Sequence, residues 1–87
     1  MKLIFLPRAS NELLALPRHI SRRIVKKMKW YVAQDNPLSF AKRMTDSDLG
    51  TFRFRVGDYR VLCDVEKGAI TVLLVLSVKN RKEAYRL

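Results

Sequence analysis

The chain has 87 residues, of which 48% are apolar and 30% charged, so it can build one small packed domain and is not a disordered sequence. Lysine and arginine number 18 against 8 acidic residues, which gives a net charge of +10 and an isoelectric point near 10.4. This charge favours a negative partner: a nucleic acid, an anionic membrane or an acidic protein. The membrane is the weaker option, because the apolar residues occupy the positions of a globular core.

The single cysteine, Cys63, excludes an internal disulfide and a metal site built from several cysteines. The apolar run that opens the chain is too short for a signal peptide, and no stretch has the length of a membrane span. We therefore expect a cytoplasmic protein without a membrane partner.

The first part of the chain predicts a strand and two helices. Residues 2–6 form a strand pattern that Pro7 ends, because proline cannot donate to a sheet ladder. Residues 8–16 carry three leucines of a short amphipathic helix, and Pro17 breaks it. The second helix is predicted over residues 18–34, where apolar side chains recur at steps of four and three: Ile20, Ile24, Met28 and Tyr31.

The pattern then changes to a period of two. Residues 38–44 fit either a short helical turn or an extended connector, and residues 45–50 read as a loop. Strands are predicted at residues 52–56 and 59–65, joined by a Gly-Asp turn. Residues 69–78 are apolar on both faces, which indicates a central strand.

These elements predict a single α+β domain over residues 1–87, with the order β-α-α-β-β-β. The two helices should pack on one face of a small, mainly antiparallel sheet. We expect one core that contains Ile24, Met28, Phe52, Phe54, Val61 and Val72.

The opposite face should carry basic side chains. Arg53 and Arg55 alternate with the apolar residues of their strand, and Arg60 follows on the next strand. A second cluster ends the chain, with Lys79, Arg81, Lys82 and Tyr85. Several cations and one phenol on one face would suit a phosphate ligand. The structural alternative is a solvated edge strand whose charges deter aggregation.

The hairpin sequence Phe52-Arg-Phe-Arg-Val-Gly-Asp-Tyr-Arg-Val-Leu62 resembles that of the RelE/ParE toxins of bacterial type II toxin–antitoxin modules. The opening strand with Pro7, the Leu16-Pro17 helix break and the basic tail before Tyr85 extend the resemblance over nearly the whole chain. It implies a RelE-like fold, a cognate acidic antitoxin and one of two activities. RelE-type toxins cut mRNA on the ribosome, whereas ParE-type toxins inhibit DNA gyrase.

The basic residues match the nuclease branch of the resemblance, which implies an mRNA interferase that inhibits translation. Arg60, Arg81, Tyr85 and Lys79 would then be catalytic, and Arg53, Arg55 and Lys82 would bind RNA. This chain departs from many relatives in having Asn80 where they have histidine, and from some in having arginines where they have lysines. Arginine is a poor general base because it stays protonated.

No cluster of carboxylates or histidines suggests a metal or another cofactor, so we expect metal-independent cleavage. His19, the one histidine, lies in the basic second helix and reads as a solvated residue. We expect Leu62, Leu73 and Val75 to lie on the basic side and to receive a segment of the antitoxin. The alternatives are a gyrase inhibitor without nuclease activity and a plain basic RNA-binding module.

Overall fold

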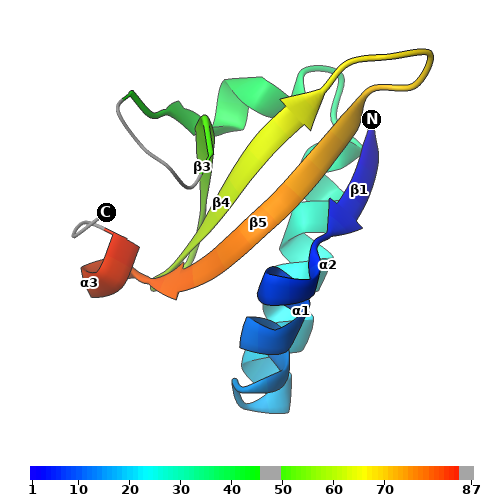
Figure 1. The fold of residues 1–87 in the computed structure, drawn as a ribbon. Coiled ribbons are helices and arrows are strands. Elements are labelled where there is room, and N and C mark those ends of the chain that lie inside the picture. Colours follow the sequence, from blue (N-terminus) through cyan, green and yellow to red (C-terminus); the bar gives the residue numbers. More distant parts are fainter. Residues whose placement is uncertain (46–49, 85–87) are drawn as a thin grey trace.

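The computed structural model describes residues 1–45 and 50–84 of the chain, and the predicted α+β class and the order of the main elements are confirmed (Figure 1). Two short elements that the sequence left open appear between the helices and the hairpin, and a short helix follows the last strand. In chain order the elements are β1 Lys2–Phe5, α1 Pro7–Leu14, α2 Arg18–Val32, the 3-10 helix η1 Pro37–Phe40, β2 Lys42–Arg43, β3 Phe52–Val56, β4 Tyr59–Glu66, β5 Val72–Asn80 and α3 Arg81–Ala84.

The five strands form one sheet with the order β1-β5-β4-β3-β2. β1 runs parallel to β5, and every other neighbouring pair is antiparallel. A parallel pair needs a crossover connection, and here it passes through both helices and the hairpin. Among the described residues, β1 and β2 are therefore the edges of the sheet, and β4 and β5 are its centre.

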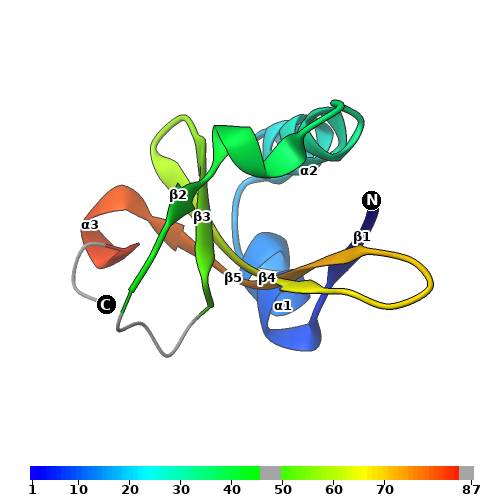
Figure 2. The same cartoon turned by 90° about the horizontal axis from the view of Figure 1, so that it is seen from above.

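The two main helices meet the sheet differently. Seen from above, α2 lies to one side of the strands, while α1 follows β1 directly and lies close to β5 (Figure 2). Glu12 of α1 accepts hydrogen bonds from the hydroxyl of Ser77 and the backbone N–H of Val78, both in β5. α1 therefore continues along β5 beyond the end of β1. No helix in the described part of the chain is both long and apolar enough to cross a membrane.

One hydrophobic core joins the helices to the sheet. Ile24 and Met28 of α2 are fully buried against Phe54 of β3 and Val61 of β4, as predicted. Phe52 packs on the same core and is partly buried. Burying a large apolar side chain contributes about 1.5–3 kcal/mol, so this contact between α2 and the hairpin accounts for much of the stability of so small a domain.

A β-bulge changes the alternation of side chains in β5. Leu62 pairs with Ser77, whereas the next residue of β4, Cys63, pairs with Val75. One step along β4 thus corresponds to two steps along β5, and Leu76 is the extra residue. A bulge of this kind moves every residue beyond it to the opposite face.

The bulge explains two wrong predictions. Leu73 and Val75 are fully buried in the core, so they cannot form the exposed surface that was predicted to receive an antitoxin. Leu62 in β4 is excluded from that surface for a different reason, since it is only 1% exposed although it does not belong to the core cluster. Val72, predicted to be a core residue, is half-buried and lies outside the core cluster. Because β5 is apolar on both faces, its sequence could not show which set of side chains faces α2.

Two glycines with positive φ, Gly50 and Gly57, lie near the two ends of β3. Gly57 has φ of 58° in the β3–β4 turn, a conformation that most residues avoid. Gly50 has φ of 109°, and a Cβ there would lie 2.6 Å from the carbonyl oxygen of Cys63. The next residue, Thr51, donates its backbone N–H to that same oxygen at 3.0 Å. The loop predicted at residues 45–50 falls partly outside the described residues, at 46–49.

Candidate RNA-binding site

The β3–β4 hairpin brings three of the predicted site residues together. Arg53 and Arg55 alternate with buried Phe54 and Val56, so their side chains leave the sheet on the face opposite the core. Arg55 pairs with Arg60 across the two strands. Directly opposed like charges destabilise a sheet, which gives this arrangement a cost that a bound anion would offset.

Arg60 is buried, with only 6% of its surface exposed. Its Nη1 donates to the backbone carbonyl oxygens of Gly57 and Tyr59, each at 3.0 Å. These bonds fix the guanidinium beside the β3–β4 turn and satisfy part of its hydrogen-bonding capacity. A fixed guanidinium can bind a phosphate oxygen without a large loss of side-chain freedom.

The segment formed by η1 and β2 adds two site residues that the sequence did not predict. Lys42 pairs with Arg53, and Phe40 precedes it at the end of η1. Together with Arg55 and Arg60 they line one pocket of about 280 Å³. We call this the basic pocket: Phe40, Lys42, Arg53, Arg55 and Arg60. None of the described residues that line it is acidic.

The described residues of the C-terminal cluster, Lys79, Arg81 and Lys82, are not among those that line this pocket, but they lie near it. The backbone N–H of Arg81 donates to the carbonyl oxygen of Asp58 at 2.7 Å, which places the start of α3 beside the β3–β4 turn. The side chains of Arg81 and Lys82 are exposed. Tyr85 lies outside the described residues. The structure thus brings Arg53, Arg55 and Arg60 together in one pocket. It also places the start of α3 beside the β3–β4 turn.

Lys79 has a partner that the sequence did not indicate. It pairs with Arg60 in the ladder between β4 and β5, and its Nζ lies 2.6 Å from a carboxylate oxygen of Glu12. Burial raises the pKa of Glu12, but hydrogen bonds from Lys79, Val78 and Ser77 outweigh it, and the pKa falls below its usual value. The ammonium group of Lys79 is therefore engaged by a carboxylate on the α1 side.

Other chemistry has little support within the described residues. His19 is exposed at the start of α2, and within residues 1–45 and 50–84 no three His, Cys, Asp or Glu residues lie together as a metal site would require. Burial raises the pKa of the Cys63 thiol well above its ordinary value, so it stays protonated and unreactive. Asp64 accepts hydrogen bonds from the backbone and side chain of Thr51.

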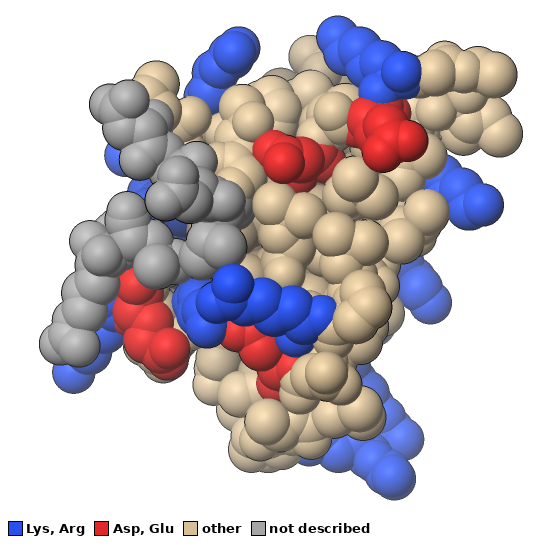
Figure 3. Space-filling view, in the orientation of Figure 1, with Lys and Arg blue, Asp and Glu red and all other residues tan. Residues whose placement is uncertain are grey.

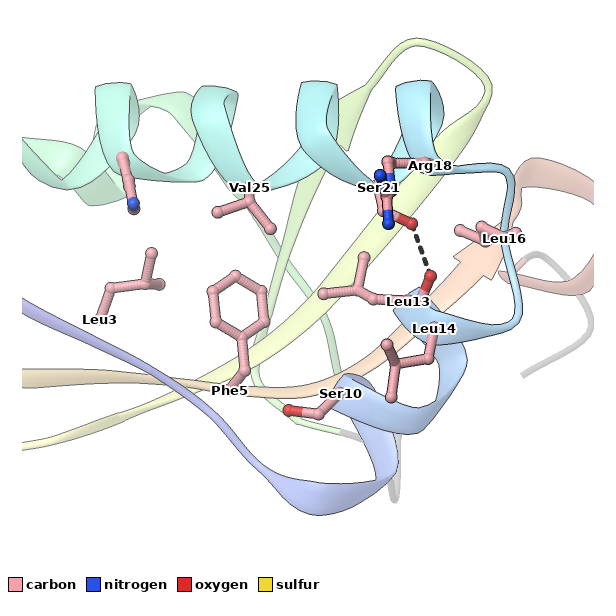
Figure 4. Close-up of a pocket in the computed structure, with 10 residues that line it drawn as sticks. Leu3, Phe5, Ser10, Leu13, Leu14, Leu16, Arg18, Ser21 and Val25 are labelled. Carbon is pink, nitrogen blue, oxygen red and sulfur yellow. Dashed lines mark hydrogen bonds between the residues drawn. The ribbon is translucent and has the colours of Figure 1, made fainter.

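A larger hollow of about 690 Å³ lies between α1, α2 and β1. We call it the helical hollow, and its walls include Leu3 and Phe5 of β1 and Leu13 of α1, with Val25 of α2 facing them (Figure 4). The Ser21 hydroxyl donates to the carbonyl oxygen of Leu13 and ties the two helices together at one side. Its apolar walls suit a protein side chain and not a phosphate.

The charge of the molecule is spread widely. Most lysine and arginine side chains of one face project around its outline, and one lies across the lower middle of the face next to acidic atoms (Figure 3). The rest of the centre consists mainly of uncharged residues, with acidic side chains in its upper half. A net charge of +10 on a body with a radius of gyration of 12.0 Å gives a positive field over most of its surface. The basic pocket is distinguished by the convergence of its cations and not by charge alone.

Comparison with known proteins agrees with this architecture. The chain is similar to one in the RelBE2 toxin–antitoxin complex of Mycobacterium tuberculosis, with 28% identity, a TM-score of 0.73, and coverage of 92% of this chain and 96% of the other. A chain of the RelB–RelE antitoxin–toxin complex of Methanococcus jannaschii shares the fold, with 21% identity, a TM-score of 0.62 and 95% coverage of both chains.

No curated protein matches the chain significantly. A family model, described as the ParE toxin of the type II toxin–antitoxin system parDE, matches residues 3–85. That match spans nearly the whole chain and includes most of β1, both main helices, and the elements η1, β2, β3 and β4 that carry the basic pocket. The chain therefore belongs to the RelE/ParE family of type II toxin–antitoxin toxins.

Proposed function

We propose that this toxin inhibits translation in the cytoplasm by cutting mRNA bound to the ribosome, without a metal ion. The observation that carries the proposal is the basic pocket, where three arginines of the β3–β4 hairpin and a lysine of the neighbouring strand β2 converge. Guanidinium groups bind phosphate oxygens in two-point geometry and stabilise the negative charge that develops during phosphoryl transfer.

The proposed reaction is attack by the ribose 2′-oxygen on the adjacent phosphorus. A bond from the 2′-oxygen to phosphorus forms, the bond to the 5′-oxygen breaks, and the products are a 2′,3′-cyclic phosphate and a 5′-hydroxyl. Arg60 and Arg81 are assigned to the phosphate and Lys82 to the RNA backbone. Arg53 and Arg55 are assigned to the RNA backbone or to stabilisation of the charge that develops on the leaving 5′-oxygen. The leaving oxygen takes up one proton, and the 2′-hydroxyl gives one up.

Tyr85 is the residue that we assign to proton transfer. Lys79 shared this role in the sequence prediction, but its ammonium is held by Glu12 at 2.6 Å. We assign Lys79 instead to fixing the end of β5, where α3 and its basic residues begin. A site with no strong base depends on positioning, and the ribosome would supply it by holding the scissile phosphate in line.

We also propose that an acidic antitoxin inserts an amphipathic segment into the helical hollow. The hollow has apolar walls, and Leu14 beside it is 83% exposed, which is unusual for a large apolar side chain. Arg18 and Lys29 also line it and would attract carboxylates of the segment. The similar chains in the Mycobacterium tuberculosis and Methanococcus jannaschii structures belong to complexes with antitoxins.

Purified ribosomes programmed with a defined mRNA test the proposed activity. We expect the wild-type toxin to cut the mRNA only when ribosomes are present, and primer extension to map the cuts. Arg55→Gln should lower the cleavage rate about a hundredfold or more, as removal of one transition-state donor does. Arg22→Gln on α2 is the matched control, since Arg22 is exposed and lies outside the basic pocket.

Inhibition of DNA gyrase is the second candidate function, and the ParE description of the matching family model favours it. A gyrase inhibitor needs a binding surface and no transition-state donors. Arg55→Gln would then keep its toxicity while the fold is intact, and ribosome-bound mRNA would stay whole. The same variant therefore separates the two functions.

A further inference from the structure

Phe40 is a large apolar residue in a pocket whose other described lining residues are all cationic. It is 46% exposed and lines the basic pocket together with Lys42, Arg53, Arg55 and Arg60. A phosphate site built from cations gains nothing from a phenyl ring. An exposed ring beside cations does suit a ligand that has both a phosphate and an aromatic base.

The ring of Phe40 is held firmly. Its centroid lies 5.3 Å from that of Trp30, at an interplanar angle of 72°, and 5.5 Å from that of Tyr31. Tyr31 in turn packs on buried Phe54 at 5.0 Å, and its hydroxyl donates to the backbone carbonyl oxygen of Arg55 at 2.7 Å. The ring is therefore fixed relative to the strand that carries the arginines.

Trp30 is also half-exposed, but its surroundings differ. The Nζ of Lys27 lies 4.3 Å from the centre of the Trp30 ring, in a cation–π contact on α2. Trp30 lines a separate shallow hollow with Lys27, Arg23 and Lys26. Of these two exposed rings, only Phe40 shares a pocket with the arginines of β3 and β4.

We propose that Phe40 stacks on a nucleobase of single-stranded RNA whose neighbouring phosphate is held by Lys42, Arg53 and Arg55. The inference rests on the proposed function and adds to it a residue that contacts the base. Single-stranded RNA is the ligand class because its bases are free to stack on an aromatic side chain, whereas duplex bases are not. Stacking is tolerant of sequence, so this contact orients the strand and leaves base choice to other contacts.

Fluorescence anisotropy with two labelled probes tests the stacking. One probe is an adenosine hexamer, and the other is a hexamer of abasic ribose phosphates, both measured at one fixed salt concentration. We expect the wild-type protein to bind the adenosine probe about tenfold more tightly, the scale of one base–aromatic stack. Phe40→Leu keeps an apolar side chain but should lose this preference, while its affinity for the abasic probe stays the same.

A second variant keeps the test decisive if Phe40→Leu fails to fold. The chain has one tryptophan, so Trp30→Phe combined with Phe40→Trp moves the only indole into the basic pocket. Its fluorescence should be quenched by the adenosine probe and not by the abasic probe. Equal quenching by both probes, or a base preference that survives in Phe40→Leu, would overturn the inference.

The cleavage assay keeps the two proposals separate. Base-dependent quenching without mRNA cleavage would refute the nuclease function and leave Phe40 as part of an RNA-binding site. Ribosome-dependent cleavage that Phe40→Leu does not slow, with no base preference in the wild-type protein, would refute the stacking role alone.

Discussion

Glu12 and Lys79 form an ion pair of 2.6 Å that joins α1 to the end of β5, just before the basic helix α3. The same carboxylate accepts hydrogen bonds from the Ser77 hydroxyl and the Val78 backbone N–H. Both donors lie in the part of β5 that does not pair with β1. Hydrogen bonds to a charged group contribute about 1.5–3 kcal/mol, a large share of the stability of a small domain.

Glu12→Gln should therefore destabilise the fold by about 1.5–3 kcal/mol at neutral pH. Because the pKa of Glu12 is lowered in the folded state, its stabilising effect is present above the unfolded value near 4.5 and is lost as pH falls through the folded pKa. Urea titrations should show a large difference between variant and wild type at pH 7 that shrinks below about pH 4.5. Glu83→Gln, at an exposed position, is the control and should change little.

Leu73→Ala and Leu74→Ala test the bulge in β5. Leu73 is fully buried, so its truncation should cost about 2–5 kcal/mol in the free energy of unfolding. Leu74 is half-buried on the opposite face, so Leu74→Ala should lower the free energy of unfolding clearly less. Equal costs, or a larger cost at Leu74, would mean that the alternation follows the unbulged register.

Gly50→Ala tests the close approach of the loop to β4. The new Cβ would lie 2.6 Å from the carbonyl oxygen of Cys63, and φ of 109° disfavours any side chain. Backbone strain of this kind costs about 1–3 kcal/mol, and the clash adds to it. Gly68→Ala is the matched control, because its Cβ would have no neighbour nearer than 3.9 Å. Thermal melting should show a markedly lower melting temperature for Gly50→Ala and an unchanged one for Gly68→Ala.

Arg81→Ala should lower ribosome-dependent mRNA cleavage on the order of a hundredfold or more if its guanidinium stabilises the transition state. The hydrogen bond from the backbone N–H of Arg81 to Asp58 survives the substitution, so the start of α3 should stay in place. Arg18→Ala on α2 should change little beyond salt-sensitive binding. A variant that is fully folded and fully active would remove Arg81 from the site.

The parts of the fold with a clear period were predictable from the sequence. The step of four and three in α2 placed Ile24 and Met28 in the core, and the alternation in β3 placed Phe54 there with Arg55 opposite. The sequence could not show which side chains of β5 face the core, because this strand is apolar on both faces. Which set is buried depends on a bulge in its pairing with β4. Register in such a strand is a property of the whole sheet.

The candidate site was predictable only in part, for a related reason. The arginines of β3 were predictable because they alternate with the apolar residues of that strand. Lys42 and Phe40 were missed because β2 has two residues and η1 has four, too few for a periodic signal. The partner of Lys79 was missed because Glu12 lies far away in the sequence, and only the packing of α1 on β5 brings the two together.

The central claim is that the toxin acts on mRNA through the basic pocket. Controlled expression in bacteria, with protein synthesis, mRNA ends and chromosome integrity followed in the same cultures, tests it most directly. We expect translation to stop, mRNA to acquire 2′,3′-cyclic phosphate ends and DNA to stay intact, and we expect Arg55→Gln to abolish the arrest. Whole mRNA on the ribosomes together with broken DNA at gyrase would contradict the claim.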